Sequence, residues 1–224
     1  MKLVHPDFGF QMQFGQGNAC ELVIESPGLF AKYVQELLRQ TEGEEGDFVL
    51  SEGDKEYPLS KCAELIVNPL AVDINDKKIL NKLYHELAEQ SVEDEMYLLT
   101  QKVTADLQSY FYQLEQRCPY MLESDMEIDM IAVFKALGVK LENYSDNFFE
   151  NIVQYTKILA ELMGKRICIF VNIRSYLDEV QMGQLVEMAV YNELALLFIE
   201  KTQDGFSNGI ARYIIDKDNC EIYE

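Results

Sequence analysis

Hydrophobic and polar positions follow one pattern from the N-terminus to about Val67. Short apolar runs bounded by turn residues predict strands at 8–14, 19–25, 47–51 and 63–67, with turns at 15–18 and 52–54. A helix interrupts them after Ser26 and Pro27, which are typical of a helix start. The apolar residues of this helix recur at helical spacing: Leu29, Phe30, Tyr33, Val34, Leu37 and Leu38. We expect that face to pack on the strands.

The pattern changes after Asn68 and Pro69, where helix-forming residues dominate. Helices are predicted at 75–89, 92–117 and 125–137, with breaks at Cys118-Pro119 and at Gly138. Consecutive helices without strands predict a helical hairpin or bundle inserted into another domain. Its excess apolar faces need a partner, and self-association is the simplest source of one.

The last third alternates helices and strands again. Helices are predicted at 146–163 and 177–191, strands at 166–172 and 194–199, and a hairpin at 212–216 and 220–223. The strand from Ile167 to Asn172 is apolar and rich in β-branched residues, as in a parallel sheet covered on both faces. The predicted fold class is therefore α/β, with one domain formed by 1–67 and 139–224 and a helical domain formed by 68–138.

Charge restricts the possible partners of this 224-residue chain. Its 39 acidic and 19 basic residues give a formal net charge of −20. A chain this acidic repels nucleic acid unless it presents a local basic surface or binds cations that neutralise its carboxylates.

The cysteines and the N-terminal residues suggest a cellular location. Five scattered cysteines without C-x-x-C spacing favour neither a disulfide framework nor a zinc ribbon. The first residues contain no signal-peptide-like apolar region, and no apolar run approaches the roughly 20 residues of a membrane-spanning helix. We expect a soluble protein of the reducing cytoplasm.

The chain lacks several sequence motifs that are typical of enzymes. The chain has no G-x-x-x-x-G-K-[ST] phosphate loop, no G-x-S-x-G nucleophile motif, and only two histidines, His5 and His85, which we expect at the surface or in packing roles. The apolar strand that ends in Glu200 is similar to the metal-holding strand of nucleotide hydrolases. Without the phosphate loop, we expect Glu200 to be an acid that meets solvent at the end of a strand. These features indicate a protein that is not an enzyme.

Acidic residues gather around the break between the second and third predicted helices of the insert: Glu115, Glu123, Asp125, Glu127 and Asp129. Carboxylates at an irregular helix junction suit Ca²⁺, which takes about 6–8 oxygen ligands in flexible geometry. The segment is not an EF-hand, because counting from Asp125 places Met130 at the glycine position and Ala136 at the bidentate acid position. The alternative is a set of helix-start acids on a solvated face, and spacing alone favours it.

Basic residues are few and unevenly distributed. Those of the inserted helices and the segments after them include Lys77, Lys78, Lys82, Lys135, Lys140, Lys157, Lys165, Arg166 and Arg174. Solvated surface charge is their simplest explanation. In a symmetric oligomer, however, a few lysines per chain would form a continuous ring.

Six short segments, in order along most of the chain, carry a resemblance to a known family. They are NPLAVDIN at 68–75, KALGVK at 135–140, SD and FE within 145–150, IFVN at 169–172, LFIE at 197–200 and YIID at 213–216. Through them the chain resembles the CRISPR-associated Csn-two family, the spacer-acquisition proteins of type II-A systems.

The resemblance implies a P-loop-NTPase-like (RecA-like) α/β head domain without phosphate-binding motifs, and an inserted α-helical leg domain. Family members form homotetrameric rings that take ends of double-stranded DNA, without sequence specificity, through a lysine-lined hole, and Ca²⁺ supports the ring. They act beside the CRISPR integrase proteins and the RNA-guided effector nuclease when new spacers are acquired for antiviral defence. An acidic outside and a basic hole would explain how so acidic a chain binds DNA.

The resemblance also implies candidate site residues. Lys135 and Lys140 match basic positions of the glycine-turn motif and are the leading DNA-contact candidates. Lys77, Lys78 and Lys157, from the unevenly distributed basic residues described above, are further candidates. The metal candidates are the five acids named above, of which 123–129 match the acidic stretch before this turn. Two features depart from the family: Cys118-Pro119-Tyr120-Met121 stands where close members have more acids, and Gln35 where some have a basic residue.

Two other functions stay open at this point. The chain is alternatively a degenerate NTPase-like nucleotide-binding protein, or a structural adaptor for the acquisition complex.

Overall fold

The computed structural model describes residues 1–15, 19–125, 127–144, 146–203 and 210–223. Contacts divide the chain into an α/β unit, Met1–Ile74 with Asn143–Glu224, and a helical unit, Asn75–Glu142. Most of the turn predicted at 15–18, and Ser145 of the family resemblance, lie outside the described residues. Both unit boundaries fall a few residues later than the sequence predicts. One reason is that the side chain of Asn75 bonds the backbone of Leu141, which keeps the segment after Gly138 with the helices.

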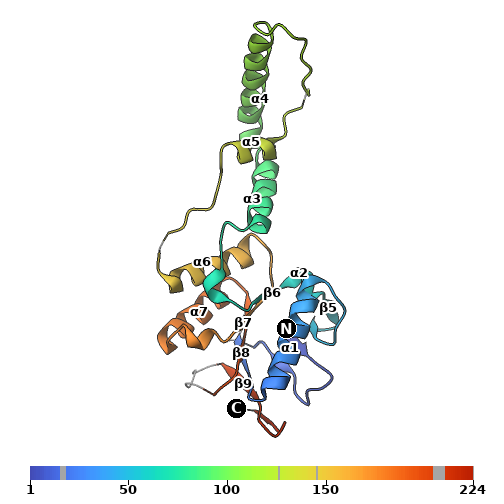
Figure 1. Ribbon diagram of the computed structural model, residues 1–224, viewed down its shortest axis with the longest axis vertical. Coiled ribbons are helices and arrows are strands. Elements are labelled where there is room, and N and C mark those ends of the chain that lie inside the picture. The colour runs from blue at the N-terminus through green and yellow to red at the C-terminus, as the bar shows by residue number, and fades with distance from the viewer. Residues whose placement is uncertain (16–18, 126, 145, 204–209, 224) are drawn as a thin grey trace. The chain divides into compact units, whose positions relative to one another are not determined.

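A six-stranded sheet forms the centre of the α/β unit (Figure 1). Its order is β10-β9-β3-β8-β7-β6, and every pairing is parallel except that of β10 with β9. The strands are β3 (Ala19–Ile24), β6 (Ala63–Ile66), β7 (Ile167–Val171), β8 (Ala195–Glu200), β9 (Ala211–Ile215) and β10 (Glu221–Tyr223). The α/β class and the C-terminal hairpin are therefore confirmed.

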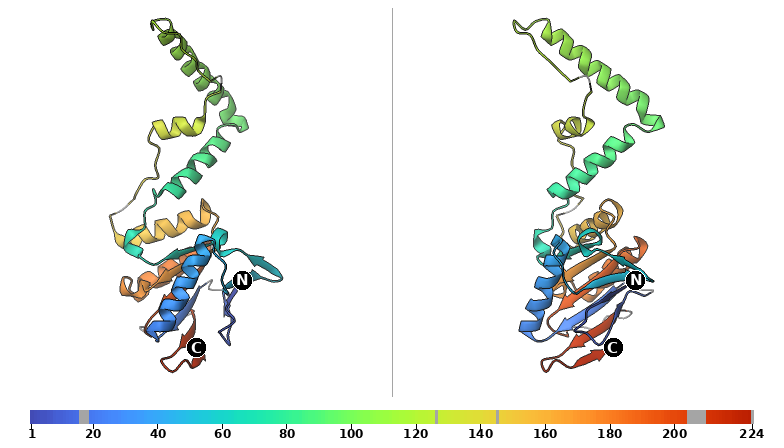
Figure 2. Two further views of the ribbon diagram at one scale, coloured as in Figure 1. Left: turned by 45° about the vertical axis from the view of Figure 1, so that its right-hand side comes forward. Right: turned by 90° about the vertical axis from the view of Figure 1, so that its right-hand side faces the viewer.

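Helices cover both faces of this sheet. On one face Leu22, Ile169 and Leu197 share a core with Tyr33 and Leu37 of α1 (Pro27–Glu42). The alternate residues of the same strands, such as Phe170 and Phe198, pack with α6 (Phe148–Glu161) and α7 (Glu179–Tyr191). Because side chains alternate between the faces of a strand, this double coverage requires the continuous apolar runs seen in the sequence. Figure 2 shows the helices on either side of the sheet.

A second, antiparallel sheet of order β2-β1-β4-β5 completes the α/β unit. Its strands are β1 (Lys2–Val4), β2 (Met12–Gln13), β4 (Val49–Glu52) and β5 (Lys55–Tyr57), and the short helix α2 (Leu59–Cys62) follows them. The strand predicted at 8–14 is wrong for most of its length. Phe8 and Phe10 are buried by ring stacking, with centroids 5.0 Å apart, and their alternation reflects burial and not strand pairing.

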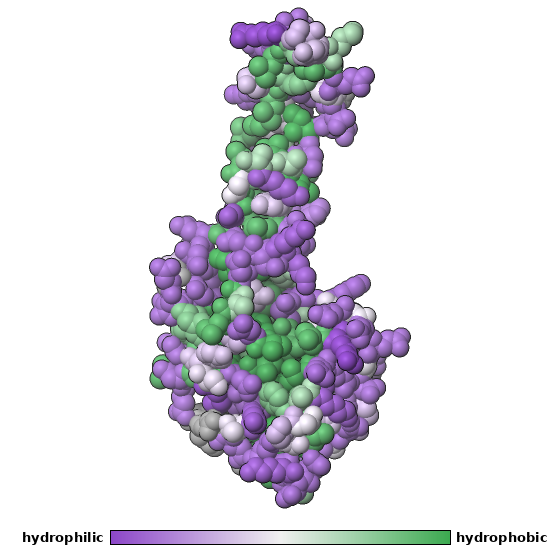
Figure 3. Space-filling model, viewed as in Figure 1, coloured by the Kyte–Doolittle hydropathy of each residue, from purple (hydrophilic) through white to green (hydrophobic). Residues whose placement is uncertain are grey.

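The described residues of the helical unit, 75–125 and 127–142, form three helices: α3 (Lys77–Gln90), α4 (Asp94–Glu115) and α5 (Met130–Ala136). The third is shorter than the predicted helix at 125–137, because Asp129 caps its start by accepting a bond of 2.9 Å from the Ile131 N–H. Apolar residues run along the helices of this unit (Figure 3), and Leu98 of α4 is 75% exposed. None of the helices in the described ranges is both long and apolar enough to cross a bilayer.

Candidate nucleic-acid interface

The turn after α5 carries the two leading lysine candidates. Gly138 has a left-handed φ of 67°, and its N–H and that of Val139 bond to the carbonyls of Lys135 and Phe134 at 3.1 Å. This closure ends the helix, as the sequence predicts, since a left-handed position after the last turn favours glycine. Lys135 lies in the last helical turn and Lys140 two residues beyond the glycine, and both are exposed.

Two side chains fasten the segment beyond this turn to α3. The Tyr84 hydroxyl donates to the Val139 carbonyl at 2.9 Å. The Asn75 amide donates to the Leu141 carbonyl at 3.1 Å and accepts from the Leu141 N–H at 2.9 Å. Lys140 is thus held between two anchored neighbours, with its own side chain exposed.

The same bonds bring Lys140 to the start of α3, where Lys77 and Lys78 are exposed in the first turn. Lys135 lies further along this helix, with its Nζ 5.9 Å from the centre of the Tyr84 ring. Tyr84 follows Lys77 by two helical turns on the same face, which corresponds to about 10 Å. The structure therefore places four of the five lysine candidates in one unit along α3.

Lys157 does not belong to the helical unit. It lies in α6 of the α/β unit. Its Nζ lies 3.7 Å from Glu161, and both side chains are about half exposed. An exposed pair of this kind is weak. The structure therefore gives no reason to join Lys157 with the other four lysines.

Other basic residues of the α/β unit are engaged in internal contacts. Lys165 donates to the Ala63 carbonyl at 2.7 Å, and Arg166 pairs with Glu52 at 2.9 Å. Arg174 and Arg212 both pair with the carboxylate of Glu21, which is buried in β3. Sequence reasoning missed this cluster, although an acid in the middle of an apolar strand was a visible signal for it.

The prediction that Glu200 meets solvent is wrong. Its exposed fraction is only 4%, because β8 lies inside the sheet with β3 on one side and β7 on the other. The Arg174 N–H donates to its carboxylate at 3.1 Å. Burial raises the pKa of Glu200 to about 7, and the nearby charge of Glu21 adds to the effect.

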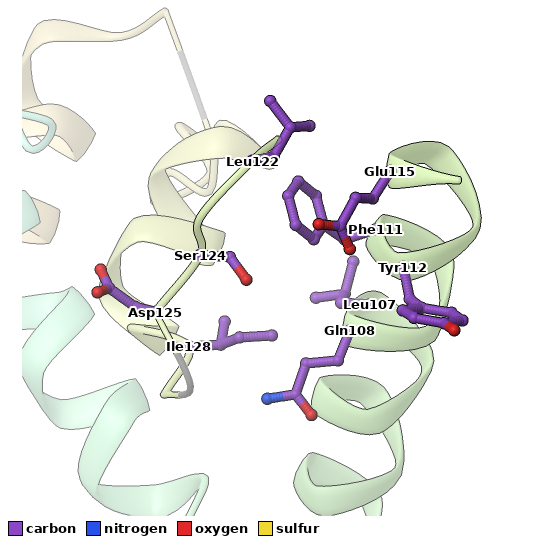
Figure 4. Close-up of a pocket in the computed structure, with 9 residues that line it drawn as sticks. All are labelled: Leu107, Gln108, Phe111, Tyr112, Glu115, Leu122, Ser124, Asp125 and Ile128. Carbon is purple, nitrogen blue, oxygen red and sulfur yellow. The ribbon is translucent and has the colours of Figure 1, made fainter. Parts of the chain in front are cut away.

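Two of the acidic candidates line a cavity of about 470 Å³ between α4 and the segment that leads to α5. Figure 4 shows the Glu115 carboxylate directed into this space and the Asp125 carboxylate directed away from α4. The remaining lining is largely apolar and includes Leu107, Phe111 and Ile128. The cavity is therefore an apolar groove with an acid at its edge.

The other acids of the set are Glu123 and Glu127, both exposed, and Asp129, which caps α5. Among the residues that the structure describes, no three of these five acids have carboxylate oxygens close enough together to bind one ion. Their chemistry suits Ca²⁺, since all are carboxylates, but one chain does not gather them. A calcium site at these residues stays a prediction.

Among the described residues, one trio does bring ligand atoms within 4.8 Å of one another: His5, Glu36 and Asp47. The Nδ1 atom of His5 accepts the Asp7 N–H at 3.1 Å, so a neutral ring carries its proton on Nε2, 3.2 Å from Glu36. A histidine that binds a metal normally donates from its second nitrogen, whereas here that nitrogen accepts. His5 is thus a buried packing histidine, as the sequence predicts, while His85 is exposed.

Comparison with known proteins identifies the family. A family model described as "CRISPR-associated protein (Cas_Csn2)" matches residues 40–219. The chain belongs to the Csn2 family. A Csn2 protein of Enterococcus faecalis is 32% identical over 216 residues, which cover 92% of each chain. A Csn2 protein of Streptococcus agalactiae is 28% identical over 206 residues, 90% of this chain and 89% of the relative.

The Csn2 match confirms the family resemblance seen in the sequence, and its residues include all the lysine and acidic candidates. The family's CRISPR association therefore applies to this chain. Asn75 and Tyr84, which hold the lysine-bearing segment, were not among the site candidates. Asn75 was visible only as part of the NPLAVDIN segment, and Tyr84 had no signal in the sequence.

Proposed function

We propose that this Csn2-family protein binds the ends of double-stranded DNA without sequence preference, as a calcium-dependent homotetrameric ring that is not an enzyme. Its role is the acquisition of new CRISPR spacers for antiviral defence, beside the integrase proteins and the RNA-guided effector nuclease. The observation that carries the proposal is the group of exposed lysines along α3, namely Lys77, Lys78, Lys135 and Lys140, in a chain of net charge −20.

Exposed lysines of this kind suit contacts with phosphate. Each is a flexible point charge, and phosphate contacts position a protein on DNA without reading its sequence. A closed oligomer would repeat the group around a symmetry axis and concentrate positive charge there. The acidic remainder of each chain would then face away from the DNA.

Calcium would be held by carboxylates from the set Glu115, Glu123, Asp125, Glu127 and Asp129. Since one chain does not gather three of them, the ion would join carboxylates from segments or copies that come together on assembly. Its main contribution would be charge neutralisation, which lowers the repulsion between acidic chains and between protein and phosphate.

The α/β unit supports a role without catalysis. Glu200, the residue in the position of a metal-holding acid, receives a backbone hydrogen bond from Arg174 and lies buried. Glu21 occupies the guanidinium groups of Arg174 and Arg212. Glu200 lies at the carboxyl end of β8, the end at which open α/β sheets bind ligands, and the protein itself thus engages it.

Duplex binding measured over a range of salt concentrations tests this proposal. Unrelated duplexes should bind equally, and log K should fall linearly with log salt by about 0.9 for each neutralised phosphate. Lys135→Ala with Lys140→Ala should weaken every duplex alike, whereas Lys102→Ala, which removes an exposed charge from α4, should not. Strong sequence preference, or binding that is unchanged in high salt, would contradict the proposal.

A further inference from the structure

The lysine-bearing segment is organised by contacts between residues far apart in the sequence. Tyr84 bonds Val139 across 55 positions, and Asn75 bonds Leu141 across 66. Between the two anchors lies Lys140, which is itself exposed. Without these anchors, the loop would lose conformational freedom whenever Lys140 bound a phosphate, and this would weaken binding.

Tyr84 contacts the lysine group in a second way. Its side chain is buried, with 7% exposed, and its ring lies below the Lys135 ammonium at 5.9 Å from the ring centre. One residue therefore combines a cation–π contact to the lysine before Gly138 with a hydrogen bond to the residue before Lys140. The left-handed turn at Gly138 separates the two contacts.

We infer that Tyr84 and Asn75 are positioning residues that preorganise Lys135 and Lys140 for contact with DNA phosphates. The inference rests on the proposed function and deepens it, since it assigns DNA affinity to residues that do not touch DNA. Its physical basis is that ordering a long side chain and its backbone on binding weakens affinity, and a segment already held in place avoids that loss.

Tyr84→Phe gives the sharper test, because it removes only the hydroxyl and keeps the ring under Lys135. It should weaken duplex binding about fivefold, the equivalent of one ordinary hydrogen bond. Asn75→Ala acts on the other anchor and should weaken binding by at least as much. Tyr110→Phe is the matched control, since Tyr110 is an exposed tyrosine of α4 and its loss of a hydroxyl should leave affinity unchanged.

The decisive readout is the dependence of these effects on Lys140. In a Lys140→Ala background, which itself should lower the salt slope by about one, neither Tyr84→Phe nor Asn75→Ala should weaken binding much further. Thermal unfolding of each variant separates affinity from stability, because a purely structural role would lower stability equally in both backgrounds without this coupling.

The outcomes are distinguishable. If wild type binds duplex and Lys140→Ala weakens it, but both anchor variants bind like wild type or lose the same factor in either background, the positioning role is overturned and the proposed function stands. If wild type binds no duplex with calcium present, the proposed function fails and the inference falls with it. Should Tyr84→Phe unfold, the same comparison with Asn75→Ala decides the question.

Discussion

Glu21 is the most completely buried charged residue of the sheet, and it pairs with two arginines. Arg212 donates to its carboxylate at 2.6 Å, and Arg174 donates to the other carboxylate oxygen. When one partner of a buried ionic network is removed, the remaining charges stay buried without it, and this lowers the free energy of unfolding strongly. Replacing the whole network with apolar residues can lower it much less.

Glu21→Ala should therefore lower the free energy of unfolding by about 3–5 kcal/mol, since both guanidinium groups lose this carboxylate. Urea unfolding followed by circular dichroism measures the change. Glu161→Ala, which removes one member of the exposed pair with Lys157, is the control and should have little effect. A similar, small change in both variants would show that the buried cluster is not a structural centre.

Glu200 predicts a pH dependence of stability with a definite sign. Burial raises its pKa from 4.5 to about 7, so the folded state holds the proton more tightly than the unfolded state. The favourable contribution is complete below pH 4.5 and is lost as the pH rises to about 7, by about 3 kcal/mol at most. Glu200→Gln, which cannot ionise, should lose less stability than wild type between pH 5 and pH 8. Identical pH profiles of the two proteins would contradict this cause.

At the residue scale, sequence reasoning succeeds for local chemistry. The glycine at 138 and the lysines on either side of it were visible because the turn uses residues close in the chain. The partners of Tyr84, Asn75 and Glu21 were not, because only the folded chain brings them together. The solvent exposure of Glu200 was mispredicted because the residues of a strand do not reveal whether it lies at the edge or in the interior of the sheet.

At the scale of helices and strands, the longer elements were predictable from the sequence and the shortest strands were not. Long helices, such as α3, α4, α6 and α7, and the buried strands β3, β7 and β8 agree closely with the predicted ranges. The strands β1, β2 and β5 have only two or three residues and are defined by their partners, so no periodicity in the sequence marks them.

The turn that ends α5 gives a prediction at the element scale. Gly138→Ala places a Cβ at a φ of 67°, which should destabilise the helical unit by about 1–2 kcal/mol and weaken duplex binding by disturbing Lys135 and Lys140. Gly183→Ala is the matched control, because Gly183 lies within α7 with open space around its Cβ position. This substitution should raise the free energy of unfolding by about 0.5–1 kcal/mol. Thermal unfolding and duplex affinity are measured on both. Equal behaviour of the two variants would argue against a constrained turn.

At the scale of the whole molecule, the exposed apolar face of α4 is the feature that most needs a partner. Leu98 and Leu99 are 75% and 56% exposed, so replacing both with Lys should cost a single chain little. The double variant should instead reduce self-association, because charged side chains would be buried at the contact. Sedimentation equilibrium measures the mass, and an unchanged assembly would place the contact elsewhere.

The proposed function depends on calcium assembling copies of this acidic chain into a ring that takes DNA ends. The most direct test is the mass of the complex in solution, with calcium and with chelator, in the presence of either a blunt linear duplex or a closed circle of the same sequence. A tetramer should form with calcium and bind the linear duplex but not the circle, since a ring can load only at an end. A monomer that is indifferent to calcium and binds neither DNA would contradict it.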